Sequence, residues 1–270
     1  MEKFLQFDPR TISCGDSSAT VLTKRGGLTV SFVWHGRELF YYEEDTILDT
    51  SREVRGGIPV LFPACGRMQE GKYDTVPKHG FARGAEWNVV EQSADTLTLS
   101  ITDNDTTRGY FPHGFTFLQT YRIEADKLTL SQEIKNTGEN ALPFSLGFHP
   151  YFKIDPAVST AVVPSDRYED TTGKYSFDGK FQFKNDYDSV CTNTKGDTSV
   201  LDTGLGYNIT VRGSEPFLYT VVWSPTGAQF ACIEPWTATP NALNTGFDII
   251  TLAPGESASF AMEISASESV

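Results

Sequence analysis

The chain has 270 residues, a formal charge of −13, and a hydrophobic share of 39% that includes 19 Phe and 11 Tyr. This length and apolar content are enough for a full hydrophobic core and exclude a disordered chain. The acidic charge disfavours broad binding to nucleic acids or anionic membranes, so an anionic ligand would need a local cluster of Arg and Lys.

The four cysteines, at positions 14, 65, 191 and 232, are too widely spaced for a Cys-x-x-Cys metal knuckle. They are also too few for a disulfide scaffold, so we expect reduced thiols. The first residues lack the apolar core of a signal peptide, and no run of 18 apolar residues occurs. We therefore expect a soluble cytoplasmic protein.

Hydrophobic and polar residues alternate with a period of two along much of the chain, which is typical of half-buried β-strands. The pattern is clearest over residues 115–124 and 128–135, and Ala125-Asp126-Lys127 between them indicates a hairpin turn. Further strands are predicted at 96–102, 207–211, 219–223, 229–234 and 258–264. No stretch of a dozen residues shows a 3.6-residue period with caps, so helix should be scarce.

Short strands joined by turns at this spacing predict an all-β fold, a large antiparallel β-sandwich with little helix. Residues 160–206 are polar and rich in Asp, Lys, Gly and Thr, so we expect loops and irregular strands there. No linker, repeat or low-complexity tract interrupts the chain. Residues 1–270 are therefore expected to form a single domain.

The stretch LGFHPYF (146–152) places His149 between aromatic residues and a proline, after the strand pattern ends at Lys135-Asn136. A histidine can exchange a proton near neutral pH, and a tight proline turn would give it a fixed direction. On this stretch alone two interpretations stand: a catalytic acid, or a histidine satisfied within the core.

The stretches RGGIPVLFP (55–63) and KHGFAR (78–83) carry charged side chains in loops rich in Gly and Pro. Paired glycines allow backbone to approach a ligand closely, so these loops could present Arg55, His79 and Arg83 to a polar small molecule. The alternative is that the glycines and prolines serve turns and the arginines are solvated. The pattern is not a phosphate-binding P-loop, because no Gly-Lys-Ser/Thr ending or following helix is present.

The stretch FACIEPW (230–236) ends an apolar strand with a carboxylate, Glu234. Burying a charge is costly unless it has a partner or a task, so Glu234 is the best candidate for a general base. A solvent-facing carboxylate on an edge strand is the alternative. Trp236 could stack on the apolar face of a sugar ring.

Four stretches, taken in order, resemble the aldose 1-epimerase (galactose mutarotase-like) superfamily, and most closely its hexose-6-phosphate epimerase and LacX-type branches. They are RGGIPVLFP, HGFAR, LGFHPYF and CIEPW. The family's fold is a large β-sandwich of galactose mutarotase type. The resemblance implies that His149 is the general acid and Glu234 the general base. It further implies that His79 binds the sugar near its ring oxygen and that Arg55 contacts substrate.

Two further roles follow from the resemblance. Asp188 is placed as the aspartate that binds sugar hydroxyls, and Arg83 matches an arginine near the phosphate of phosphorylated substrates. The sequence ACGRM (64–68) departs from the Trp-aromatic-Gly of the hexose-6-phosphate epimerases, which puts a phosphate preference in question. Cationic side chains nevertheless gather in or near these loops: Arg55, Arg67, Lys72, Lys78 and Arg83.

Interconverting the α and β anomers of a hexose requires one base at the C1 hydroxyl and one acid at the ring oxygen. Glu234 would be ionised and His149 protonated, which mutual attraction would favour. No metal, nucleotide or other cofactor is expected. The expected partner is a small-molecule sugar or sugar phosphate, and the choice between a monomer and a homodimer stays open.

Three other classes of protein would need different residues. A non-catalytic sugar-binding or sugar-sensing protein on the same fold would be marked by loss of His149 or Glu234, and both are present. A glycoside hydrolase usually needs two carboxylates flanking the bond, whereas this pair is one His and one Glu. A metalloenzyme is disfavoured because the four histidines show no His-x-x-x-His spacing. Whether Tyr73, His113 or Asn244 reaches the pocket is left open.

Overall fold

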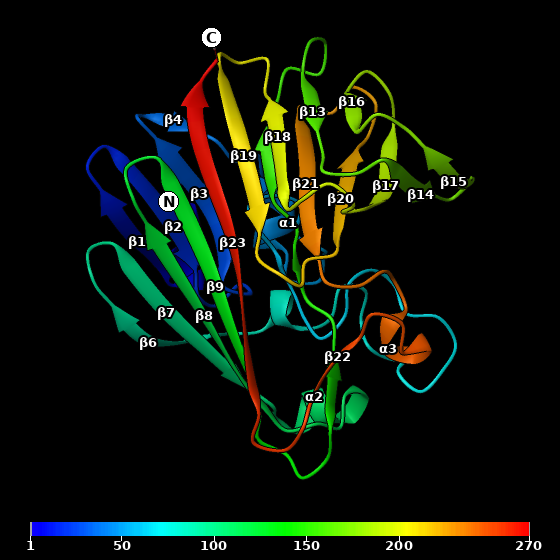
Figure 1. The fold of residues 1–270 in the computed structure, drawn as a ribbon. Helices are drawn as coiled ribbons and strands as arrows, with labels where there is room; N and C mark the ends of the chain where they lie inside the picture. Colours follow the sequence, from blue (N-terminus) through cyan, green and yellow to red (C-terminus); the bar gives the residue numbers. More distant parts are fainter. Residues whose placement is uncertain (1, 270) are drawn as a thin grey trace.

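The computed structural model describes residues 2–269, and two large antiparallel sheets form the centre of the fold (Figure 1). The larger sheet has nine strands, in spatial order β16 (Lys180–Gln182), β13 (Thr160–Val162), β18 (Thr198–Asp202), β19 (Tyr207–Gly213), β23 (Ser257–Glu268), β9 (Lys127–Asn136), β8 (Phe115–Ile123), β7 (Thr96–Thr102) and β6 (Asn88–Gln92). The second has eight: β15 (Gly173–Ser176), β14 (Arg167–Asp170), β17 (Tyr187–Thr192), β20 (Tyr219–Ser224), β21 (Phe230–Trp236), β11 (Gly147–Phe148) and β5 (Val60–Leu61) in order, with β12 (Tyr151–Lys153) also paired to β21.

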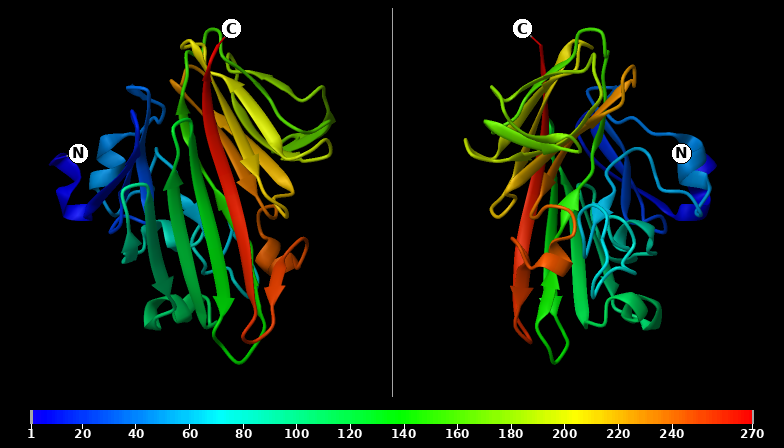
Figure 2. Two further views of the ribbon diagram at one scale, coloured as in Figure 1. Left: turned by 60° about the vertical axis from the view of Figure 1, so that its left-hand side comes forward. Right: turned by 90° about the vertical axis from the view of Figure 1, so that its right-hand side faces the viewer.

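Two smaller sheets and a few short helices complete the fold. One sheet contains β1 (Pro9–Cys14), β2 (Ser17–Leu22), β3 (Leu28–Trp34) and β4 (Arg37–Glu38), and the other pairs β10 (Leu142–Phe144) with β22 (Ile250–Leu252). The helices are α1 (Glu44–Leu48), α2 (Asp105–Tyr110) and α3 (Ala242–Thr245), with the 3-10 turns η1 (Glu2–Phe7) and η2 (Ala82–Gly84). The predicted all-β sandwich with little helix is confirmed. Strands β1 to β4 and the β14–β15 hairpin lie on opposite sides of the long strands β8, β9 and β23 (Figure 2).

The alternating sequence patterns form strands where they were predicted. β7 has the predicted bounds, and β8 and β9 form the hairpin, with buried and more exposed positions alternating along both. Two predictions need correction. Residues 160–206 hold six short strands, β13 to β18, and are more regular than expected. β21 does not end at Glu234 but continues through Pro235 to Trp236.

An aromatic core fills the space between the sheets. Phe62 packs against Phe115 and Phe117 of β8, with ring centroids 5.1 Å apart in both pairs, and against Phe144 at 5.7 Å. One apolar cluster extends from Ile12 to Ala266. Offset and edge-on aromatic pairs of this kind make the core rigid, which gives the strands of the second sheet a firm support.

The two faces of β20 and β21 have different environments. Val222, Ala231 and Ile233 point into the main core. Successive strand residues point to opposite faces, so Cys232 and Glu234 lie on the other face of β21. This second face, supported by the core beneath it, carries the candidate site.

The paired glycines of the RGG stretch serve backbone packing, which corrects the expected role in ligand approach. A Cβ at Gly56, whose φ is +133°, would lie 2.2 Å from Cα of Tyr42, and one at Gly57 would lie 2.3 Å from the carbonyl oxygen of Thr29. Any side chain there would collide with neighbouring backbone. The glycines therefore fix the loop that follows Arg55 against the β3 region.

Candidate active site

The strand register places His149 opposite Glu234. β11 and β12 both pair with β21, with Gly147 opposite Trp236 and Tyr151 opposite Cys232. His149, midway between these two pairings, therefore lies opposite Glu234. The Nδ1 atom of His149 lies 3.4 Å from Oε1 of Glu234. The structure thus brings together the two residues predicted to be catalytic, which are 85 positions apart in the sequence.

Aromatic rings hold the His149 imidazole in one orientation. The ring stacks on Tyr151, with centroids 4.7 Å apart and planes at 7°. It meets His79 at 5.4 Å and Trp223 at 5.9 Å in edge-on contacts. These contacts leave the imidazole little freedom to turn, as a directed proton transfer requires.

Trp236 positions the Glu234 carboxylate. Its indole Nε1–H donates a hydrogen bond to Oε2 of Glu234 at 3.1 Å. The side chain is 4% exposed and packs in an apolar cluster with Leu61, Cys65 and Tyr219. A ring buried in this way offers little surface to a sugar, which counts against the stacking role predicted for Trp236; its hydrogen bond instead orients the Glu234 carboxylate.

Burial drives each member of the pair toward its neutral form. Burial lowers the pKa of His149 to about 3, and the positive charges of Arg83 and Lys78 add to this effect. Burial likewise raises the pKa of the Glu234 carboxyl well above its ordinary value, partly opposed by the hydrogen bond from Trp236. The expected resting pair of carboxylate and imidazolium is therefore not the form that burial favours.

The neutral pair and the ion pair contain the same single proton. They are tautomers that differ only by its transfer across the 3.4 Å gap, so the two groups titrate as one unit. Either form offers one proton donor and one proton acceptor. Sugar hydroxyls would add hydrogen bonds to the charged form, which shifts the balance toward it.

His79 is oriented to donate a hydrogen bond into the site. Its backbone N–H donates to the carbonyl of Gly66 at 2.7 Å, and its ring Nδ1 accepts from the Gly66 N–H at 3.1 Å. Burial, together with nearby positive charge, keeps the pKa of His79 well below its ordinary value. The neutral ring therefore carries its proton on Nε2. This geometry suits the sugar-binding role predicted for it.

Asp188 lies on the same face of the sheet as the catalytic candidates. It pairs in register with Trp223 of β20, which in turn pairs with Cys232 of β21. Its negative charge contributes to the raised pKa of Glu234. Asp188 is exposed and forms no hydrogen bond or ion pair with the rest of residues 2–269. Its carboxylate is therefore free to accept from hydroxyl groups.

The cationic residues have their own carboxylate partners. Arg83, whose side chain is 14% exposed, lies 3.0 Å from Glu53, while the more exposed Arg55 lies 3.7 Å from Glu43. Burial raises the pKa of Tyr151, the ring stacked on His149, well above its ordinary value, and the charges of Arg83 and Arg55 partly oppose this effect. The charges of Arg55 and Arg83 therefore both act on a ring of the candidate site.

A second group of polar residues fixes a neighbouring loop. The Tyr73 hydroxyl lies 2.9 Å from Nε2 of His113, and Oδ1 of Asn244 accepts from the Tyr73 N–H at 2.9 Å. Lys72 lies over the Tyr73 ring, with Nζ 4.7 Å from the centroid. Lys72 belongs to this loop-fixing group, whereas Lys78 lies with Arg83 beside the site.

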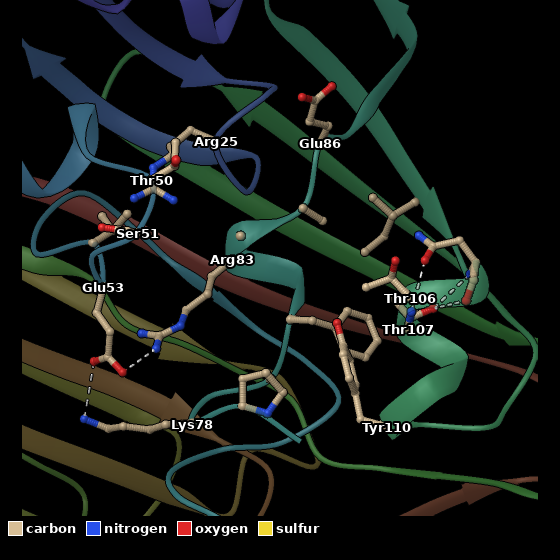
Figure 3. Close-up of a pocket in the computed structure, with 18 of the residues that line it drawn as sticks. Arg25, Thr50, Ser51, Glu53, Lys78, Arg83, Glu86, Thr106, Thr107 and Tyr110 are labelled. Carbon is tan, nitrogen blue, oxygen red and sulfur yellow. Dashed lines mark hydrogen bonds and ion pairs between the residues drawn. The ribbon is translucent and has the colours of Figure 1, made fainter. Parts of the chain in front are cut away.

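A cavity of about 910 Å³ opens around the side chains of Lys78 and Arg83 (Figure 3). Its wall includes Arg25, Glu53, Lys78, Arg83 and Tyr110. His149 and Glu234 do not line it. Lys78 and Arg83 act on His149 by their charge and also line the cavity, so they mark where the two regions meet.

The sequence analysis assigned no role to Trp223 or Tyr151, although the rings of both contact His149. Trp223 is half-buried and lies beside His149 and Tyr151, so its ring can stack on a sugar where Trp236 cannot. Trp223 lies two residues after Val221, so the sequence places both on one face of β20. Only the pairing of β20 with β21 shows that this face also carries Glu234.

The buried thiol of Cys232 raises the question of a metal. The ligand atoms of His149, Cys232 and Glu234 lie within 4.8 Å of one another. A thiolate is the form that binds a metal, and burial raises the pKa of Cys232 well above its ordinary value. Burial likewise raises the pKa of the Glu234 carboxyl. Burial therefore favours the protonated forms of both groups. No helix among the described residues is long and apolar enough to cross a membrane.

The model of the aldose 1-epimerase family matches residues 12–265. "Putative glucose-6-phosphate 1-epimerase" of Escherichia coli K12 is 27% identical over 198 residues, which cover 70% of this chain and 64% of that protein, less than two thirds of its length. "Protein LacX, plasmid" of Lactococcus lactis subsp. lactis is 22% identical over 276 residues, covering 84% and 90%.

Solved structures show the same fold. The Slr1438 protein from Synechocystis sp. PCC 6803 is 30% identical with a TM-score of 0.91, and the match covers 97% of this chain and 96% of that one. A putative aldose 1-epimerase from Escherichia coli K12 is 20% identical with a TM-score of 0.79, covering 97% and 99%, and supports the fold alone.

Proposed function

The chain belongs to the aldose 1-epimerase family, and from this premise we propose that it interconverts the α and β anomers of a hexose or hexose 6-phosphate. Family membership supports a carbohydrate epimerase. The observation that carries the finer proposal is the 3.4 Å approach of His149 Nδ1 to Glu234 Oε1 in a buried site lined by aromatic rings.

The reaction needs only proton transfers and one reversible bond cleavage. Glu234 takes the proton from the C1 hydroxyl, His149 gives a proton to the ring oxygen O5, and the C1–O5 bond breaks to leave an aldehyde. Rotation about C1–C2 turns the other face of the carbonyl toward O5. The reverse proton transfers close the ring as the other anomer. Each transfer by a positioned group contributes about 10²–10⁴-fold.

The spacing of the pair suits this reaction. O1 and O5 are bonded to the same carbon, so an acid and a base that serve both must lie close together. No hydrogen bond to another described residue occupies Nδ1 of His149. A sugar whose hemiacetal oxygens approach both groups therefore displaces no hydrogen bond at Nδ1 of His149.

Neighbouring residues would bind the rest of the sugar. The Nε2–H of His79 would donate to the ring oxygen region, and the free carboxylate of Asp188 would accept from hydroxyls. Trp223 would stack on the apolar face of the ring. Arg55 and Arg83 would contact the more distant substituents, including a 6-phosphate if one is present.

Magnetisation-exchange NMR tests the proposal. The rate of anomer exchange is measured for glucose, galactose and glucose 6-phosphate with and without the protein. Catalysed exchange of any one of them supports an aldose 1-epimerase and ranks the substrates. Saturable sugar binding without faster exchange would instead identify a sugar-binding protein on this fold.

A further inference from the structure

Glu53 forms ion pairs with both Arg83 and Lys78, the two cations whose charges act on His149. Its carboxylate lies 3.0 Å from Nη2 of Arg83 and 3.8 Å from Nζ of Lys78 (Figure 3). The side chain is 56% exposed, whereas that of Arg83 is 14% exposed. Glu53 is thus a surface carboxylate bound to a nearly buried guanidinium.

The charges of the two cations act on His149 as well as on Glu53. Arg83 and Lys78 both lower the pKa of His149, so their charges act across the site. The same two side chains line the cavity of about 910 Å³. A ligand group placed between them would therefore lie next to a sugar held at His149.

The cavity wall carries an additional buried positive charge. Arg25 is 4% exposed, and its Nε and Nη2 atoms donate to four backbone carbonyls, those of Thr46, Ile47, Asp49 and Arg52. Within the part of the chain that the structure describes, no carboxylate lies within ion-pairing distance of Arg25 and its Nη1 makes no hydrogen bond. The positive charge of Arg83 is close enough to act on Arg25.

The carboxylates of this cavity do not balance these charges. Glu53 is shared by two cations, Asp105 is fully exposed and lies 3.9 Å from Arg108, and Glu86 forms no ion pair with any residue from 2 to 269. Figure 3 shows Glu86 pointing away from Arg83. Glu53 is therefore the one carboxylate that occupies the space between Arg83 and Lys78 in this wall.

We propose that Glu53 is a resident anion of a phosphate subsite: its carboxylate occupies the position between Arg83 and Lys78 that the phosphate of a phosphorylated hexose takes on binding. Glu53 thereby determines how strongly the protein discriminates phosphorylated from free sugars. This proposal rests on the proposed function, since it assigns a specificity role beside the same acid/base pair.

The exchange of one anion for another is physically easy here. A half-exposed glutamate gains little from an ion pair in water and can turn into solvent. A sugar phosphate carries about −1.5 to −2 charges near neutral pH and presents three oxygens that a guanidinium binds bidentately. The phosphate therefore gains more from Arg83 than the carboxylate loses. A neutral hexose gains nothing from displacing Glu53.

The test compares Glu53→Gln with Glu86→Gln, which makes the same charge change in the same cavity without touching Arg83 or Lys78. Inorganic phosphate and glucose 6-phosphate are titrated by calorimetry, and anomer exchange is measured on glucose 6-phosphate and glucose. In Glu53→Gln we expect both phosphates to bind about three- to tenfold more tightly, so that the preference for glucose 6-phosphate over glucose rises. In Glu86→Gln phosphate binding should change by less than about twofold.

Equal tightening in the two variants, or none in Glu53→Gln, would overturn the proposal and leave Glu53 a solvated ion-pair partner. Arg83→Ala supplies a second readout, because in a chain that carries it Glu53→Gln should no longer tighten phosphate binding. The binding titrations need no activity. A protein that exchanges no anomers therefore refutes the proposed function, while the phosphate titrations still decide the role of Glu53.

Discussion

His149 and Glu234 form an isolated buried pair. Nδ1 of His149 is 3.4 Å from Oε1 of Glu234, and no other ion-pairing contact reaches either group from residues 2–269. Removing two charges from water is costly when only their mutual attraction and the hydrogen bond from Trp236 compensate, so the pair is poised between its neutral and ionic tautomers. A site poised in this way can pass a proton in either direction, as a reaction that runs from α to β and back requires.

The first prediction concerns the two members of this pair. Glu234→Gln and His149→Ala should each lower catalysed anomer exchange by at least about 10²-fold, because each removes one proton-transfer partner. The glutamine keeps an oxygen that accepts from Trp236, so the fold should be retained. Exchange is followed by NMR and the fold by circular dichroism. Glu133→Gln on the exposed side of β9 is the control, and near-normal exchange in Glu234→Gln would show that another residue is the base.

The second prediction concerns the pH profile of kcat/KM. The pKa of His149 is lowered to about 3, so the pair accepts a second proton only in strong acid, far below the 6.5 of an ordinary histidine. The raised pKa of Glu234 means that the single proton is lost only well above 4.5. Activity should therefore persist below pH 6.5 instead of falling there.

A charge variant checks the cause of this shift. Arg83 and Lys78 help to lower the pKa of His149, so Lys78→Met should raise that pKa and move the acid limb of the profile to higher pH. The limb is measured on a free sugar so that phosphate binding does not contribute. An acid limb near 6.5 in the wild type, unmoved in the variant, would mean that His149 titrates as a solvated histidine.

The third prediction separates the two tryptophans. Trp223→Ala should raise KM by about two- to tenfold with a smaller effect on kcat, because a stacked ring contributes about 0.5–1.5 kcal/mol to binding. Trp236→Phe should act on kcat, since it removes the hydrogen bond that orients Glu234. It should also raise the pKa of Glu234 further and move the alkaline limb upward. The reverse assignment, with KM rising mainly in Trp236→Phe, would restore the stacking role to Trp236.

Local sequence patterns were enough to predict much of the fold. β7, β8 and β9 follow from period-two alternation, because each has one face on the core and one face more exposed. β21 is buried on both faces, so alternation could not show where it ends, and it extends to Trp236. The short strands of 160–206 carry polar residues on their open faces, which concealed their regularity.

The sequence predicted those site residues that stand in distinctive motifs. His149, Glu234 and His79 stand in short stretches with distinctive neighbours, and the structure places them together. Trp223 and Glu53 carry no such signal, because their roles depend on register and on loop packing between distant segments. The protonation of the pair could not be read from the sequence either, since it is set by burial that only the fold creates.

The last prediction concerns Arg83 and the 6-phosphate. Charge-assisted hydrogen bonds from a guanidinium contribute about 1.5–3 kcal/mol each, or about ten- to a hundredfold in affinity, and a neutral hexose gains none of this. We expect hexose 6-phosphate to be preferred over the free sugar. Arg83→Ala should erode this preference mainly through KM, because a phosphate remote from C1 is bound about equally in the ground and transition states.

Arg108→Ala is the matched control, since Arg108 is an exposed arginine that pairs with Asp103 and does not line the cavity. Raising the ionic strength should weaken turnover of glucose 6-phosphate more than that of glucose, because screening acts on the charged ligand. If glucose or galactose turned over as well as glucose 6-phosphate and Arg83→Ala affected all three alike, the protein would be an epimerase of free sugars. Arg83 would then serve chiefly as the cation that, with Lys78, lowers the pKa of His149.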